Sequence, residues 1–163
     1  MTVRLLAPDD YEVFKRIRLE ALRTAPEAFA SSASDWEKLP DDEWRRRIEN
    51  NSVVVCFRQD EPVGIMGLMR QQSSKMAHRA SLIMVYMRPS ERGGGQAAAM
   101  LGLLLDHARA SGIWQVELAV SAENPAAIRF YRREGFDEIG RIPAGFLHEG
   151  REIDEIMMAR RLT

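Results

Sequence analysis

The sequence predicts one α/β domain built on a mixed, mostly antiparallel sheet of about seven strands flanked by helices. Three apolar runs with only short connections between them favour antiparallel neighbours, and they span Ser52–Arg58, Val63–Gln71 and Met76–Arg88. From Gln115 onward the pattern alternates strand, helix and strand, which requires at least one parallel crossover. The length of 163 residues suits a single domain covering the whole chain, 1–163.

The first part of the chain is interpreted as a short strand followed by helices. Thr2–Leu6 has strand character, and Asp9 with Glu12 has the spacing of a capping box at a helix start. Apolar residues then recur at helical spacing as far as Thr24. Two shorter helical pieces are expected to begin at Pro26 and at Pro40.

Glycines and caps predict the remaining elements. Gly64 and Gly67 interrupt a strand and indicate a bulge or a close approach. Asn124 followed by proline is a strong helix start. Two more helices are expected, one that follows Arg92–Ala97 and ends near Ser111–Gly112, and one that ends at Gly135. The remaining strands are expected over Gln115–Ser121, Phe136–Ile142 and Arg151–Arg161.

Charge and composition limit the classes of binding partner that the sequence favours. The 23 basic and 24 acidic residues give a formal net charge of −1, so no global basic field favours nucleic acid or acidic lipid. No apolar run is long enough to cross a membrane, and no signal peptide is recognised. A single cysteine, Cys56, and three scattered histidines predict neither a disulfide framework nor a metal site. A reduced, soluble, cytoplasmic domain is the expectation.

A glycine loop between a strand and a helix is the most informative segment. It runs from Arg92 to Ala98, with Gly93, Gly94 and Gly95 in succession. Glycines allow backbone N–H groups to approach an anion closely, and the helix start adds free donors, so the segment is suited to holding phosphate. The alternative is a flexible turn. A Walker A loop is excluded because the lysine and hydroxyl residue are missing, whereas a dinucleotide fingerprint with Glu117 about twenty residues on stays a weaker rival.

Two motifs together resemble the GNAT superfamily of coenzyme A-dependent N-acetyltransferases. Arg92, Gly95 and Ala97 match the three fixed positions of its Gln/Arg-x-x-Gly-x-Gly/Ala signature. The segment from Asn124 through Tyr131 to Gly135-Phe136 is similar to the family's Asn…Ala…Tyr…Gly-Phe segment. The resemblance implies a sheet in which two parallel strands splay apart to form a cleft for acetyl-CoA.

The resemblance also implies roles for individual residues. The loop backbone would hold the pyrophosphate of acetyl-CoA, the end of the fourth strand would pair with its pantetheine arm, and Asn124 would face the cofactor. The cofactor-binding set is therefore Val85, Met87, Arg92, Gly93, Gly94, Gly95, Gln96, Ala97 and Asn124. Tyr131 matches the family's general acid, which would protonate the departing thiolate. Its alternative is a core aromatic, and that of Asn124 is a helix cap alone.

The general base and the acceptor amine are less defined. Ala119 stands where some branches of the family carry a glutamate, and Glu117 two residues earlier lies on the same strand face. Glu117 is thus a candidate base, with a surface ion pair as the alternative. Other possible routes for the proton are His78, Asp154, Glu155 and a water relay to solvent. The family's acceptor pocket corresponds to residues 25–36 and the loop at 143–150, where four side chains could line it: Phe29, Trp36, Phe146 and His148.

The expected function is transfer of an acetyl group from acetyl-CoA directly to a primary amine of a small molecule or peptide, with no metal. One alternative is a non-catalytic module that binds acyl-CoA as a sensor. The other is a nucleotide-binding domain. Many members of the family dimerise through sheet edges, so a homodimer stays open.

Overall fold

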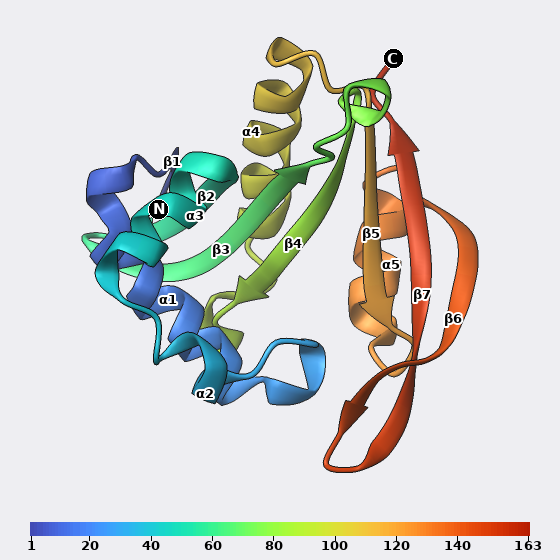
Figure 1. Ribbon diagram of the computed structural model, residues 1–163, viewed down its shortest axis with the longest axis horizontal. Coiled ribbons are helices and arrows are strands. Elements are labelled where there is room, and N and C mark those ends of the chain that lie inside the picture. The colour runs from blue at the N-terminus through green and yellow to red at the C-terminus, as the bar shows by residue number, and fades with distance from the viewer.

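The computed structural model describes residues 1–163, which form one seven-stranded sheet in the order β1-β2-β3-β4-β5-β7-β6 (Figure 1). The strands are β1 (Thr2–Leu5), β2 (Ser52–Arg58), β3 (Glu61–Arg70), β4 (Arg79–Met87), β5 (Gln115–Ser121), β6 (Asp137–His148) and β7 (Arg151–Arg161). All neighbours are antiparallel except β4 and β5, which are parallel. The mixed sheet with one parallel crossover is as predicted.

Helices cover both faces of this sheet. They are α1 (Tyr11–Thr24), α2 (Ala33–Trp36), α3 (Asp41–Asn50), α4 (Gln96–Ala110) and α5 (Pro125–Arg133). Strand β2 shows how the two layers arise, because its side chains alternate between faces. Val54 and Cys56 pack in the core with α4 and α5, whereas Val53, Val55 and Phe57 pack in a second core with α1 and α3. Cys56 is therefore a buried core residue, as expected.

A bulge in β4 separates it from β5. Ile65 pairs with Tyr86 but Gly67 pairs with Ile83, so β4 holds one more residue than β3 over this stretch. Met84 lies in the bulge with φ of +58°, and a side chain at Gly67 would collide with it. Gly67 is thus the close approach that its place in the strand predicted.

The bulge opens the sheet. Only Arg79, Ala80 and Ser81 of β4 pair with β5, and beyond them the two strands diverge (Figure 1). From Leu82 onward, the edge of β4 that faces β5 has no strand partner, which leaves backbone groups available to a ligand. The cleft predicted between two splayed parallel strands is present.

Local signals at the helix ends are partly confirmed. The Asn124 side chain accepts a hydrogen bond of 3.2 Å from the Ala127 amide and caps α5, and Gly135 follows that helix with φ of +88°. The capping box expected of Asp9 and Glu12 is wrong. The Asp10 carboxylate accepts from the Ala7 amide instead, at 2.8 Å, and is held by Arg4.

Two strand boundaries differ clearly from the predictions. The strand expected from Met76 begins at Arg79, because Ser74–Met76 forms a 3-10 turn. The strand expected to end at Ile142 continues to His148 through an irregular stretch between Ile142 and Phe146. The loop expected at 143–150 is consequently a β-hairpin with a tight turn at Glu149 and Gly150, both with positive φ. None of the helices combines the length and apolar character needed to cross a bilayer.

Candidate active site

A cavity of about 660 Å³ lies between the glycine loop, the end of β4 and α5. We call it the loop cavity. Eight of the nine residues predicted to bind the cofactor line it, together with Tyr131; they are Val85, Met87, Arg92, Gly93, Gly95, Gln96, Ala97 and Asn124. Gly94 is not among the lining residues. The fold thus brings two motifs that are far apart in the sequence to one cavity.

The loop presents backbone rather than side chains to this cavity. Gly93 and Gly95 have φ of +88° and +83°, and no atom lies within 4 Å of where a side chain would begin at either. Helix α4 starts at Gln96, and the first amides of a helix have no partner within it. Its first turn contains no acidic residue. The arrangement can bind phosphate oxygens through N–H donors and the positive end of the helix dipole.

Charged side chains around the loop are already engaged. Arg92 folds back and its Nε donates to the Met87 carbonyl at 2.9 Å, which ties the loop to the end of β4. Glu91 accepts hydrogen bonds from Nε and Nη2 of Arg58 at 2.7 and 2.6 Å, and these bonds lower the pKa of the Glu91 carboxyl. The loop carboxylate nearest the cavity is thus neutralised by a cation.

Tyr131 is a buried residue in the wall of the loop cavity. It is 5% exposed, and its ring packs edge-on against Phe130 and Phe136 at 5.4 and 5.9 Å between centroids. Burial alone raises the pKa of the Tyr131 hydroxyl, with no hydrogen bond or charge contributing. The hydroxyl is therefore protonated over the neutral range and can donate to a group that enters the cavity.

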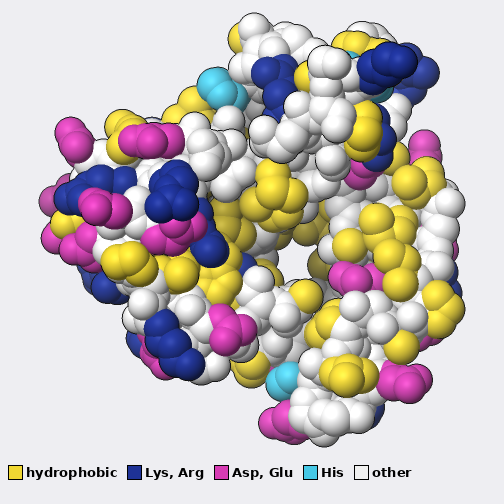
Figure 2. All heavy atoms as spheres, in the orientation of Figure 1, with side chains coloured by type: hydrophobic (Ala, Val, Ile, Leu, Met, Phe, Trp, Pro, Cys, Tyr) yellow, Lys and Arg dark blue, Asp and Glu magenta, His cyan; other side chains and the backbone are white.

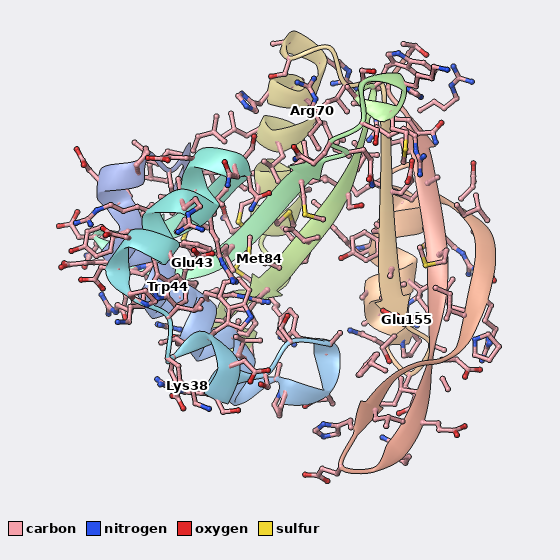
Figure 3. The ribbon with its side chains drawn as sticks, viewed as in Figure 1. Lys38, Glu43, Trp44, Arg70, Met84 and Glu155 are labelled. Carbon is pink, nitrogen blue, oxygen red and sulfur yellow. The ribbon has the colours of Figure 1, made fainter.

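A second cavity, of about 700 Å³, occupies the opening where β4 and β5 diverge. We call it the splay cavity. It shares Ala28 and Phe29 with the loop cavity, so the two are neighbours. Figure 2 shows the molecule hollowed here, with hydrophobic side chains on both sides. Met84 on β4 and Glu155 on β7, labelled in Figure 3, line it from opposite sides.

Glu117 lines the splay cavity but is held in an ion pair. Its two carboxylate oxygens accept from Nε and Nη2 of Arg79, each at 2.6 Å, and Gln115 donates a third hydrogen bond at 3.0 Å. Chiefly because of the hydrogen bonds from Arg79, the pKa of the Glu117 carboxyl is lowered. This geometry favours the ion-pair interpretation over a catalytic base. The pair joins β4 to β5 just before they part.

The four predicted acceptor-pocket residues divide into two groups. Phe29 and Trp36 line the splay cavity. Phe146 and His148 do not line it; both lie on the β6–β7 hairpin, where Phe146 pairs with Ile153. Residues 143–148 extend β6 instead of forming the expected loop, and a role of Phe146 and His148 in the acceptor pocket stays a prediction.

Two charged residues that line the splay cavity were not in the predicted set of site residues. Arg18 on α1 is only 3% exposed, and its Nε and Nη1 have no hydrogen-bond partner. A signal existed, because Arg18 lies four residues after Phe14 and four before Leu22, on the buried stripe of the helix. The other is Glu155, which is half-buried and in no ion pair.

Comparison with known proteins agrees with this fold and site. A family model described as the acetyltransferase (GNAT) family matches residues 16–136, which is most of the chain. The chain with this splayed sheet and glycine loop thus falls in a class of acetyltransferases. This chain is a member of the GNAT family.

Individual relatives extend this comparison. A mycothiol acetyltransferase from Brachybacterium faecium is 27% identical over 132 residues, covering 81% of this chain and 39% of that protein. An L-methionine sulfoximine/L-methionine sulfone acetyltransferase from Pseudomonas aeruginosa is 35% identical over 78 residues, 48% of this chain and 45% of that protein. The chain thus spans less than half the length of either relative.

Solved structures share the fold. A GNAT phosphinothricin acetyltransferase from Sinorhizobium meliloti, solved in complex with acetyl-CoA, has a TM-score of 0.81 and 20% sequence identity, covering 99% of this chain and 88% of that one. The likeness establishes that the two chains have the same architecture.

Proposed function

We propose that this protein transfers an acetyl group from acetyl-CoA directly to a primary amine of a small molecule. The observation that carries the proposal is the loop cavity, which is lined both by the glycine loop at the start of α4 and by Tyr131. The relatives named as acetyltransferases, and the neighbouring structure with acetyl-CoA bound, support the same choice of cosubstrate.

The residues present fit this cosubstrate. Main-chain amides from Gly93 to Ala97 would hold the pyrophosphate, and no side chain obstructs Gly93 or Gly95. The unpaired edge of β4 near Val85 and Met87 would pair with the amide-containing pantetheine arm. Asn124 lines the same cavity while its Oδ1 caps α5, so its interpretation as a cap and its place beside the cofactor are compatible.

The bound thioester supplies an activated acetyl carbon. The amine nitrogen would enter through the splay cavity and bond to that carbon as the carbon–sulfur bond breaks. Backbone N–H groups on the splayed edge of β4 would stabilise the negative charge that develops on the carbonyl oxygen. Tyr131 would donate its proton to the leaving sulfur, and the proton released by the nitrogen would restore it through solvent.

Glu155 is a better candidate than Glu117 to receive the proton of the attacking ammonium. Both line the splay cavity, but Glu117 is saturated by Arg79 and Gln115 whereas Glu155 has no cationic partner. The role of Glu155 as base belongs to the proposal.

An assay of thiol release tests the proposal. The protein is incubated with acetyl-CoA and a panel of primary amines, and free CoA is measured with a thiol reagent alongside mass detection of the acetylated amine. We expect one CoA released per acetylated product. Saturable acetyl-CoA binding without turnover of any amine would favour the sensor alternative.

A further inference from the structure

Arg18 is a buried cation with no counter-ion in the protein. It projects from α1 into the splay cavity, and its Nε and Nη1 are sealed from solvent without a hydrogen-bond partner. Its guanidinium lies over the rings of Phe29 and Trp36, with its central carbon 5.0 and 4.5 Å from their centroids. Cation–π contacts of this kind recover only part of the cost of removing a charge from water.

The neighbouring charges make the position more costly still. Arg47 stacks on the same Trp36 ring at 4.3 Å, and burial together with Arg47 lowers the pKa of Arg18 to about 10. Arg18 is nonetheless charged at neutral pH. A buried charge without a partner is destabilising, so its retention points to a partner that arrives from outside.

Two charged side chains of opposite sign in the splay cavity have no ionic partner. Glu117 is neutralised by Arg79, and Arg47 donates to Glu43 at 3.1 Å. Of the four charged lining residues, Arg18 and Glu155 are then left without an ionic partner. Arg18 comes from α1 and Glu155 from β7, which flank the opening from opposite sides (Figure 1). Most of the remaining wall is apolar.

From these observations we infer that the acceptor is a small amino acid, whose carboxylate binds Arg18 and whose amine faces Glu155. A carboxylate supplies the missing counter-ion and accepts charge-assisted hydrogen bonds. The ammonium group complements Glu155, and the apolar wall accommodates an uncharged side chain. This inference rests on the proposed function, because it names the substrate class of the same site.

Matched ligands test the role of the carboxylate. L-Methionine and L-phenylalanine are compared with their primary amides and with phenethylamine, in two readouts: thermal stabilisation in the presence of saturating CoA, and thiol release with acetyl-CoA. We expect the acids to stabilise the protein and to be acetylated with kcat/KM at least tenfold above the amides. Equal stabilisation by acids and amides would overturn the inference.

Variants locate the effect at Arg18. Arg18→Met removes the charge at similar volume and should abolish the preference for acids, whereas Arg18→Lys should retain part of it. Because a buried unpaired charge is removed, Arg18→Met should unfold at the same temperature as the wild type or higher. Arg16→Met, at an exposed position of the same helix, is the matched control and should keep the full preference.

The two proposals fail separately. If CoA compounds do not stabilise the protein and no amine is acetylated, the proposed function is wrong. If acetyl-CoA binds and amines are acetylated, but Arg18→Met has the acid preference of the wild type or simply unfolds at a lower temperature, the carboxylate site is wrong and Arg18 is a packing residue of the Trp36 cluster.

Discussion

The Tyr131 hydroxyl is the polar end of a ring that is otherwise packed against Phe130 and Phe136. No hydrogen bond within the protein contributes to the pKa of this hydroxyl, so under the proposal it is free to donate to a ligand sulfur. The same isolation keeps the hydroxyl protonated, since burial raises its pKa. Tyr131 belongs to the hydrophobic core and also lines the loop cavity, so its role as proton donor stays a prediction.

Replacing Tyr131 tests its role as proton donor. Tyr131→Phe should lower kcat by about 10²-fold or more, the usual contribution of a general acid, and leave the affinity for acetyl-CoA nearly unchanged. Tyr11→Phe is the control, because Tyr11 lines neither cavity. Steady-state kinetics and acetyl-CoA titration give both quantities. Wild-type turnover in Tyr131→Phe would remove this residue from the mechanism.

Glu117 provides a second test, of stability. Glu117→Gln should lower the free energy of unfolding by about 1–3 kcal/mol at pH 7, because two charge-assisted hydrogen bonds from Arg79 are weakened. Glu123→Gln is the matched control: its ion pair with Arg151 is equally short, at 2.6 Å, but exposed and screened by solvent, so the substitution should change stability much less. Denaturant unfolding measures both.

The pH dependence of this pair has a defined sign. The pKa of Glu117 is lowered on folding from its ordinary 4.5, so the stabilisation is complete above that pH and is lost as the pH falls through the folded pKa. The difference between wild type and Glu117→Gln should therefore shrink in acid. A variant that is as stable as the wild type but inactive would instead identify Glu117 as the base.

At the scale of elements, the bulge in β4 and the turn into α4 create the site. A strand with positive φ at Met84 cannot continue in register with β5, and the strands part beyond Ser81. The glycine loop then reverses the chain so that α4 begins with its free amides in the loop cavity. Both devices are conformations of the backbone.

The turn into α4 is testable with two glycines of contrasting conformation. Gly95→Ala places a side chain at φ of +83° and should destabilise the protein by about 1–2 kcal/mol and weaken acetyl-CoA binding. Gly102→Ala lies within α4, exposed and with open space around it, so it should stabilise by about 0.5–1 kcal/mol and leave binding unchanged. Thermal unfolding and acetyl-CoA titration measure these effects. Equal binding by both variants would contradict the account of the loop.

Elements with strong local signals were predictable from the sequence. Asn124-Pro125 and Gly135 marked both ends of α5, and Gly67 marked the close approach to β4. The positive φ at Met84 was not predictable, because methionine has no preference for it and the register of β3 against β4 imposes it. The extension of β6 over residues 143–148 was not predictable, because Pro143 and Gly145 are unusual within strands and only the pairing with β7 extends the strand.

At the scale of the whole molecule, the two cavities meet where the sheet opens. They share Ala28 and Phe29 in the connection after α1, so a donor in one and an acceptor in the other would come together at the splay. This arrangement favours direct transfer between two bound molecules over a covalent enzyme intermediate. The single cysteine, Cys56, is buried and free, and burial raises its pKa, which makes it a poor nucleophile.

The loop cavity was predictable from the sequence to a degree that the splay cavity was not. Glycines and a helix start form a phosphate site through the backbone, and that pattern is local in the chain. Arg18 and Glu155 lie 137 positions apart in the numbering and meet one cavity only because β4 and β5 diverge. No local sequence pattern predicts that these two residues line one cavity. The only indication in the sequence was the position of Arg18 on the buried face of a helix.

The most direct measurement is thermal unfolding with acetyl-CoA, CoA, NAD and ATP in parallel. A ligand at 100 times its dissociation constant stabilises by about 2.7 kcal/mol, which corresponds to a shift of roughly 5–10 °C for a domain of this size. We expect acetyl-CoA and CoA to raise the unfolding temperature by this amount, and NAD and ATP to leave it unchanged. No shift with the CoA compounds at saturating concentration, or a larger shift with NAD or ATP, would contradict it.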